Sequence, residues 1–237
     1  MGGIGELLTG RVAVVTGAGS GIGRALSIGF STDGATVVGV GHRDSTLAET
    51  VELCPGPMTT VRADLSQTDE CLRAMEHVIR AQGRVDVLVN NAAASEPGAF
   101  LDTPFERWVH MMALNVLGVA ACSRAVLPQM MQQGYGRIIT LSSRMAGVPM
   151  ARMSAYSASK AAVSALTGCL AGEISSDHPN VLINDLIPGP TKTAMTSAGQ
   201  EPEAVYPMVR DLVLLPEGGP SGHAFFRGEP YELFRPR

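Results

Sequence analysis

The sequence predicts an α/β fold in which a doubly wound parallel sheet of about seven strands carries helices on both faces. We expect one domain over residues 1–237. Two observations lead to this class. Short runs of β-branched residues alternate with longer segments whose apolar residues recur with the period of a helix. Strands that alternate with helices form βαβ units, in which the strands run parallel and are buried on both faces.

The expected strands are the short β-branched runs, and the expected helices are the segments with helical apolar spacing. The expected strands are residues 12–16, 36–40, 58–62, 85–90, 137–141, 181–187 and 223–226. The expected helices are residues 21–33, 45–53, 67–82, 104–132, 154–176 and 203–215. No shift in composition between these elements indicates a domain boundary.

Composition excludes several classes of protein. With 45% hydrophobic residues and a net charge of −4, the chain is neither disordered nor basic enough to predict a nucleic-acid partner. The first residues lack the features of a signal peptide, and no run of about 18 apolar residues predicts a membrane span. Four cysteines lie far apart, without the spacing of a disulfide framework or a metal site: Cys54, Cys71, Cys122 and Cys169. We therefore expect a cytoplasmic protein with no metal and no membrane partner.

A glycine-rich turn follows the first expected strand and opens a helix. The run TGAGSGIG occupies residues 16–23. Glycines let a backbone turn tightly and approach a pyrophosphate, and the helix N-terminus offers free N–H groups. This context predicts a Rossmann-type dinucleotide site, with an ordinary tight turn as the alternative. The expected cofactor contacts are Gly17, Ser20, Gly21, Ile22 and Gly23.

A second constellation lies around residues 143–160. Tyr156 and Lys160 are four apart in an expected helix and therefore share one face. A nearby cation favours the phenolate form of tyrosine, so the pair is a plausible acid–base unit. Ser143 ends the preceding strand, where a hydroxyl can hydrogen-bond a substrate carbonyl.

These motifs resemble those of the short-chain dehydrogenase/reductase family, in its compact single-domain branch. The resemblance rests on the T-G-x-x-x-G-x-G turn and on the Ser–x12–Tyr–x3–Lys spacing, and it extends over about residues 11–195. It implies that Tyr156 is the proton donor or acceptor and that Ser143 positions the carbonyl. Lys160 would hold the nicotinamide ribose and lower the pKa of Tyr156. Asn115 would hold a water in a proton relay to the lysine.

Three further elements match the family pattern. Asn91 and Ala92 lie in an N-N-A-G-like motif whose glycine is replaced by Ala93. Asp64 and Leu65 resemble the adenine contact, and a helix N-cap is the competing interpretation of Asp64. The last element, P-G-x-x-x-T, would close over the nicotinamide through Pro188, Gly189, Thr191 and Thr193. Beyond residue 195 the resemblance weakens, and the expected substrate lid at 196–215 is short.

The end of the second strand bears on the choice of cofactor. A carboxylate there would select NAD, whereas a basic group would accommodate the 2′-phosphate of NADP. Gly41 stands where the family's NAD-selecting Asp would stand, and His42 and Arg43 follow it. Asp44 is close enough in sequence to compete for Arg43. We expect NADP(H) in preference to NAD(H), with an exposed loop arginine as the alternative.

The resemblance implies an NAD(P)-dependent oxidoreductase acting on a small ketone, aldehyde or secondary alcohol. One alternative is a reductase of carrier-bound 3-oxoacyl chains, for which a basic patch could come from Arg124, Arg137 and Arg144. Another is a regulatory protein that binds NADP without catalysis. Relatives pair through two long helices, here residues 104–132 and 154–176, so we expect a homodimer or homotetramer.

Overall fold

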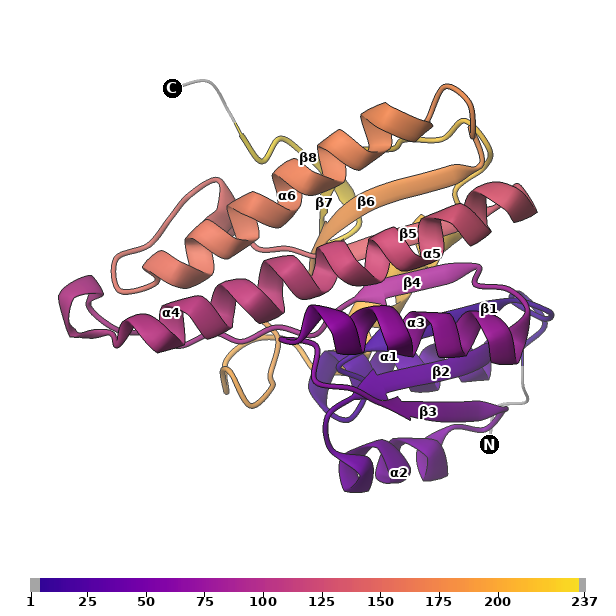
Figure 1. Cartoon of the computed structure of the whole chain (residues 1–237), viewed down its shortest axis with the longest axis horizontal. Coiled ribbons are helices and arrows are strands. Elements are labelled where there is room, and N and C mark those ends of the chain that lie inside the picture. Colours follow the sequence, from indigo (N-terminus) through magenta and orange to yellow (C-terminus); the bar gives the residue numbers. More distant parts are fainter. Residues whose placement is uncertain (1–4, 235–237) are drawn as a thin grey trace.

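The computed structural model describes residues 5–234, which form one sheet of eight strands. The strands lie in the order β3-β2-β1-β4-β5-β6-β7-β8 (Figure 1). Their bounds are β1 Val12–Thr16, β2 Thr36–Gly41, β3 Met58–Arg62, β4 Val87–Asn90, β5 Gly136–Leu141, β6 Val181–Ile187, β7 Ala224–Phe226 and β8 Glu229–Tyr231. Strands β1 to β7 pair in parallel and β8 pairs antiparallel with β7, which confirms the predicted doubly wound α/β class.

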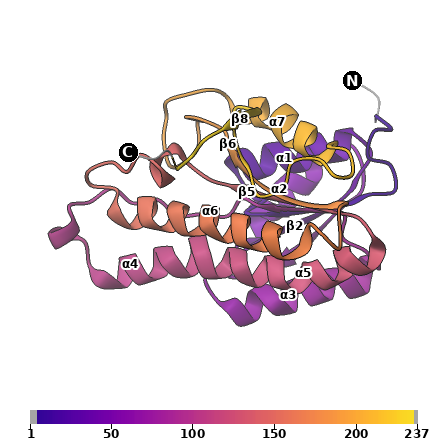
Figure 2. The ribbon, with the colours of Figure 1, turned by 90° about the horizontal axis from the view of Figure 1, so that it is seen from above.

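Helices cover both faces of the sheet (Figure 2). On one face lie α1 (Gly21–Thr32), α2 (Asp44–Leu53) and α7 (Tyr206–Val213). On the other lie α3 (Thr68–Gln82), α4 (Phe105–Met112), α5 (Val119–Gln133) and α6 (Ser154–Ile174). Short 3₁₀ turns complete the connections: η1 Phe100–Asp102, η3 Arg144–Ala146 and η4 Pro202–Val205. The expected elements therefore exist, with most bounds within two residues.

Two expected helices differ from the structure, and one strand was not expected. The single helix expected at 104–132 is divided by a π-helical segment, Ala113–Gly118, between α4 and α5. The helix expected at 203–215 begins as a 3₁₀ turn and ends at Val213. Strand β8 is not predicted because it contains Pro230, which lacks the N–H that a ladder needs. It is tolerated because β8 is an edge strand with one free side.

The long segment Phe105–Gln133 contains an 18-residue stretch with the composition of a membrane span, with a mean hydropathy of 1.5. Half of this apolar stretch is buried inside the protein. Buried residues of α5, including Val126 and Met130, join residues of α3 and of the sheet in one hydrophobic core. We therefore treat this segment as a core helix. Residues 1–4, which begin the stretch examined for a signal peptide, lie outside the described residues.

The parallel strands bring most of the candidate segments to one edge of the sheet. Strands β1, β2, β4, β5 and β6 run in the same direction, so their C-terminal ends share this edge. Each end leads into a segment singled out from the sequence, and ligands of open α/β sheets bind beyond these strand ends.

Candidate active site

The glycine turn after β1 brings helix α1 unusually close to the strand. Gly17 and Gly21 have φ angles of +67° and +51°, which side chains rarely allow. A Cβ at Gly23 would lie 2.1 Å from the carbonyl oxygen of Gly17. Ser20 is the N-cap of α1, and among the described residues its side chain forms no capping hydrogen bond. The first amides of α1, including those of Ile22 and Gly23, therefore remain available to a phosphate.

Asn91 fastens the end of β4 to the end of β1. Its Nδ2 donates to the Thr16 carbonyl at 2.8 Å, and its backbone amide donates to Thr16 Oγ1 at 2.9 Å. The Ala92 amide donates to the same hydroxyl at 3.1 Å. A Cβ at Gly17 would lie 2.9 Å from Asn91 Nδ2. Asn91 and Ala92 thus border the glycine turn and hold its shape.

Basic side chains gather at the end of β2. His42 and Arg43 are exposed, as expected for groups that meet a ligand from solvent. Asp44 does not take Arg43 as its partner: its carboxylate lies 3.8 Å from Arg62 at the end of β3. Arg62 Nε also donates to the His42 carbonyl at 3.4 Å. Sequence reasoning missed Arg62, because its place beside β2 depends on the strand order.

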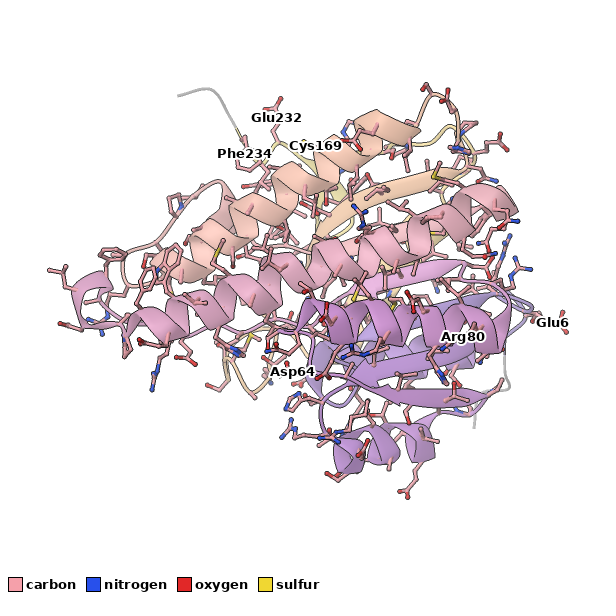
Figure 3. The ribbon with its side chains drawn as sticks, viewed as in Figure 1. Glu6, Asp64, Arg80, Cys169, Glu232 and Phe234 are labelled. Carbon is pink, nitrogen blue, oxygen red and sulfur yellow. The ribbon has the colours of Figure 1, made fainter. Side chains whose placement is uncertain are left out.

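Asp64 lies in the loop that enters α3, at the opposite end of that helix from Arg80 (Figure 3). Its Oδ1 accepts hydrogen bonds from the Ser66 amide at 3.0 Å and hydroxyl at 2.8 Å. The hydrogen bond from the Ser66 backbone amide is the main cause that lowers the pKa of Asp64. Helix α3 begins at Thr68 with Gln67 as N-cap, so the alternative of Asp64 as a helix N-cap is wrong. Leu65 is buried beneath this loop.

Ser143, Tyr156 and Lys160 come together where β5 ends and α6 begins. Ser143 Oγ accepts from the Met145 amide at 3.2 Å. The Ser143 side chain lies close enough to the Tyr156 phenol to lower its pKa. Lys160 is buried, its Nζ donates to the Leu141 carbonyl at 2.6 Å, and it lies 5.7 Å from the centre of the Tyr156 ring. The predicted constellation is therefore assembled.

The acid–base properties of this pair differ from the simple expectation. Burial raises the pKa of Tyr156, and the Ser143 side chain opposes this only in part. Burial also lowers the pKa of Lys160 to about 8. The prediction that Lys160 depresses the Tyr156 pKa considered the charge alone. In the folded protein burial sets the net direction of the Tyr156 pKa, which is upward.

Asn115 lies in the π-helical segment and is almost fully buried. Its Oδ1 accepts from the Ala94 amide at 2.8 Å, and its Nδ2 donates to the Ala94 carbonyl at 2.9 Å and to Ser159 Oγ at 3.0 Å. Asn115 therefore ties the loop after β4 to α6, on the residue preceding Lys160. π-Helical turns are frequent at functional sites.

The loop after β6 meets the glycine turn from the other side of the site. A Cβ at Gly21 would lie 3.0 Å from the methyl group of Thr193. Thr191 is buried and its hydroxyl donates to the Gly189 carbonyl at 3.2 Å. Gln200 Nε2 donates to the Pro188 carbonyl at 2.9 Å, so the short segment that follows folds back onto the loop.

Asp185 on β6 is a second ionisable group buried near Lys160, and sequence reasoning missed it. It is 1% exposed, and its Oδ1 accepts from Thr167 Oγ1 at 2.7 Å. Burial raises its pKa to about 6, while hydrogen bonds from Ser164 and Thr167 and the Lys160 charge act in the opposite direction. The signal in the sequence was a carboxylate inside a strand that is apolar except for Asp185 and the neighbouring Asn184.

Comparison with known proteins gives consistent matches. A family model described as short chain dehydrogenase matches residues 11–204. The chain is 36% identical over 211 residues to 2-(R)-hydroxypropyl-CoM dehydrogenase of Xanthobacter autotrophicus (strain ATCC BAA-1158 / Py2), covering 86% of this chain and 82% of that protein. Two solved structures are also similar. The 3-ketoacyl-(acyl-carrier-protein) reductase from Brucella melitensis complexed with NADH has a TM-score of 0.85 at 26% identity, over 93% of this chain and 99% of that one. A 3-oxoacyl (acyl-carrier-protein) reductase from Agrobacterium tumefaciens C58 with NADP bound has a TM-score of 0.83 at 26% identity, over 94% and 95%.

Proposed function

The chain belongs to the short-chain dehydrogenase family, and we propose that it is an NADP(H)-preferring carbonyl reductase of small molecules. The observation that carries this proposal is the assembly of Ser143, Tyr156 and Lys160 at the sheet edge onto which the glycine turn opens. Intact acid–base chemistry disfavours the alternative of a regulatory protein without catalysis.

The residues present fit a nicotinamide dinucleotide. The left-handed glycines and the uncapped α1 N-terminus form a cradle in which a Cβ would meet Thr193 or Asn91. When bound, the nicotinamide supplies or accepts the hydride. The pyrophosphate would be held by Gly17, Ser20, Gly21, Ile22 and Gly23, the adenine by Asp64 and Leu65, and the nicotinamide end by Asn91, Ala92, Lys160, Pro188, Gly189, Thr191 and Thr193.

The side chains of the chain itself move and hold the proton. Tyr156 donates its phenolic proton to the substrate oxygen during reduction and takes it back during oxidation. Its raised pKa keeps the phenol protonated near neutral pH, which suits the reductive direction. Ser143 donates a hydrogen bond to the same oxygen and stabilises its developing charge. Lys160 presents a positive charge beside the phenol, and Asn115 positions α6 and supports the proton relay.

Preference for NADP(H) is supported by charge at the end of β2. No carboxylate stands at Gly41, and Asp44 is directed to Arg62. His42 and Arg43 can therefore meet a 2′-phosphate without like-charge repulsion, and guanidinium groups bind phosphate through two parallel hydrogen bonds.

The alternative of a reductase that acts on carrier-bound 3-oxoacyl chains, as the names of the two similar structures indicate for those proteins, is less well supported for this chain. Arg137, expected as part of a basic docking patch, is buried, and its guanidinium donates to the Val213, Asn180 and Leu215 carbonyls. The buried Arg137 guanidinium therefore cannot contact an acidic carrier protein. The proposal also includes a short lid over 196–215, a homodimer or homotetramer, and a cytoplasmic location, which suits four unpaired cysteines.

The test measures the oxidation of NADPH and NADH by a panel of ketones and aldehydes through the loss of the ultraviolet absorbance of the reduced cofactor. Turnover should depend on Tyr156. Tyr156→Phe should lower kcat by about 10²–10⁴ while cofactor binding persists, because only the transferable proton is lost. Tyr135→Phe is the matched control, since the Tyr135 hydroxyl donates to the Val213 carbonyl, away from the site. Absence of turnover across the panel, or full activity of Tyr156→Phe, would contradict the proposal.

A further inference from the structure

The hairpin that joins β7 to β8 carries an arginine where the backbone favours other residues. Phe226 pairs with Glu229, so Arg227 and Gly228 form a two-residue turn. Their φ angles are +53° and +90°. Such turns favour Asn, Asp or Gly at the first position, because a side chain costs about 1–2 kcal/mol in this conformation. The turn itself gives no reason for an arginine, and strain of this kind is found at functional sites.

The guanidinium of Arg227 lies on the loop that borders the site. A Cβ at Gly189 would lie 3.0 Å from Arg227 Nε. The guanidinium carbon is 5.5 Å from the centre of the Phe226 ring. Arg144, which directly follows Ser143, approaches the same ring at 5.7 Å. Two guanidinium groups thus lie near the Phe226 ring: Arg144 follows Ser143 in the chain, and Arg227 lies against Gly189 in the loop after β6.

Within residues 5–234, no salt bridge neutralises either guanidinium charge. Arg144 and Arg227 are exposed, and neither forms an ion pair with any acid in residues 5–234, Glu229 across the turn included. Lys192 nearby does have such a partner, Glu201. Both guanidinium groups are therefore available to an anion from solvent. The chain as a whole carries −4, so this is a local feature of the site.

We propose that Arg144 and Arg227 bind a carboxylate on the substrate and so select oxo acids, or the corresponding hydroxy acids. This inference rests on the proposed reductase function and adds the substrate class to it. Two guanidinium groups suit a carboxylate, which each can bind through two parallel hydrogen bonds. Ser143, beside Arg144 in the chain, would then receive the carbonyl of the same molecule.

The test compares 2-oxobutanoate, 3-oxobutanoate and 4-oxopentanoate with their methyl esters, which keep the ketone and lose the charge. We expect kcat/KM for at least one acid to exceed that of its ester by about tenfold, equivalent to about 1.4 kcal/mol. Arg144→Gln and Arg227→Asn should each reduce this preference about tenfold through KM for the acid, because the clamp binds ground state and transition state alike.

Two features keep the test decisive. Arg227→Asn creates the Asn-Gly pair that this turn favours, so its melting temperature should stay the same or rise. Arg80→Gln, the same charge change in the last turn of α3 and at the opposite end of that helix from Asp64 (Figure 3), should leave the preference at the wild-type value.

Equal turnover of acids and esters, turnover of ketones but of no acid, or a preference that survives in Arg227→Asn would overturn the carboxylate site and leave the reductase proposal standing. If no charged or uncharged ketone is reduced with either nicotinamide, both proposals fail.

Discussion

Lys160 and Asp185 are two buried ionisable groups near one another, and Lys160 lies beside the Tyr156 ring. They do not share a direct ion pair: Lys160 donates to the Leu141 carbonyl, and Asp185 accepts from Thr167. Ser164 lies one turn after Lys160 on α6 and hydrogen-bonds both Asp185 and Ser142 Oγ. In the low-dielectric interior of the protein, the charge on Lys160 shifts the titration of Asp185 and the reverse.

Asp185→Asn should change the pH dependence of reduction. The Asp185 carboxylate favours protonated Lys160, whose pKa is about 8, so its removal should move the alkaline limb of kcat/KM to lower pH. At pH 8 we expect a loss of about threefold to tenfold. Below about pH 6 the wild-type Asp185 is itself protonated, so the two profiles should converge there.

The same substitution should raise stability at neutral pH. A carboxyl whose pKa is raised on folding makes the folded state less stable as pH increases from the unfolded pKa, about 4, through about 6. Asn can still accept the Thr167 hydroxyl without this cost. Thermal unfolding across pH 4–8 checks the sign, with exposed Asp177→Asn as the control. Superimposable activity profiles would show that Asp185 acts only in packing.

Arg43→Ala tests the cofactor preference. Loss of the guanidinium should raise KM for NADPH about tenfold, roughly 1.4 kcal/mol, and leave KM for NADH nearly unchanged, because only NADPH carries the 2′-phosphate. Arg62→Ala should also raise KM for NADPH, since Arg62 holds Asp44 away from Arg43. Equal effects on both cofactors, or a wild-type preference for NADH, would contradict our interpretation of this loop.

Single residues were predictable where local geometry decides their position. Helix spacing places Tyr156 and Lys160 on one face, and a strand end places Ser143, without knowledge of the rest of the chain. Arg62 and Asp185 depend on which strands are neighbours and which helix covers them. The burial of Arg137 depends likewise on the carbonyls of α7 and of the loop before β6, which no local pattern reveals.

At the scale of elements, the glycine turn joins three segments: β1, the loop after β4 and the loop after β6. Gly21→Val would place a branched side chain at φ +51° and against Thr193. We expect cofactor affinity to fall by at least about 10²-fold, or about 2.7 kcal/mol, because the phosphate cradle is filled. The melting temperature should also fall by a few degrees, since the left-handed conformation costs about 1–2 kcal/mol.

Direct cofactor binding by fluorescence and thermal unfolding check this prediction. Gly168→Ala is the control: no atom lies within 4 Å of its added Cβ, and it should stabilise α6 by about 0.5–1 kcal/mol without weakening binding. Unchanged affinity in Gly21→Val would mean that the turn has no role in binding.

The elements that sequence predicted well are those with one strong period, such as β1, α1 and α6. The π-helical segment escaped prediction because an extra residue per turn hardly disturbs apolar spacing. Its cause is tertiary: a Cβ at Gly118 would lie 2.3 Å from the Leu65 carbonyl, and Asn115 is fixed to Ala94. The C-terminal hairpin was not predicted because Pro230 lacks the N–H that a strand needs for pairing.

For the molecule as a whole, the layer of α3 to α6 leaves an apolar face uncovered. Phe105, Val109 and Leu117 recur at helical spacing along α4 and the π-helical segment and are 69%, 53% and 51% exposed. Contiguous apolar surface on a folded protein marks an interaction site, and a second copy of the same face is the commonest partner. The outer half of Phe105–Gln133 would thereby be buried in a dimer.

Val109→Glu should therefore convert the protein to a monomer without unfolding it. A carboxylate buried in the pair would lose its hydration, which weakens association by at least about 10²-fold, or about 2.7 kcal/mol. Light scattering at micromolar concentration measures the mass, and circular dichroism verifies the fold. Leu53→Glu is matched in exposure, at 54%, but lies on α2 across the sheet, so it should leave the mass unchanged. A monomeric wild type would contradict the predicted dimer. An assembly that survives Val109→Glu and dissociates in Leu53→Glu would place the interface elsewhere.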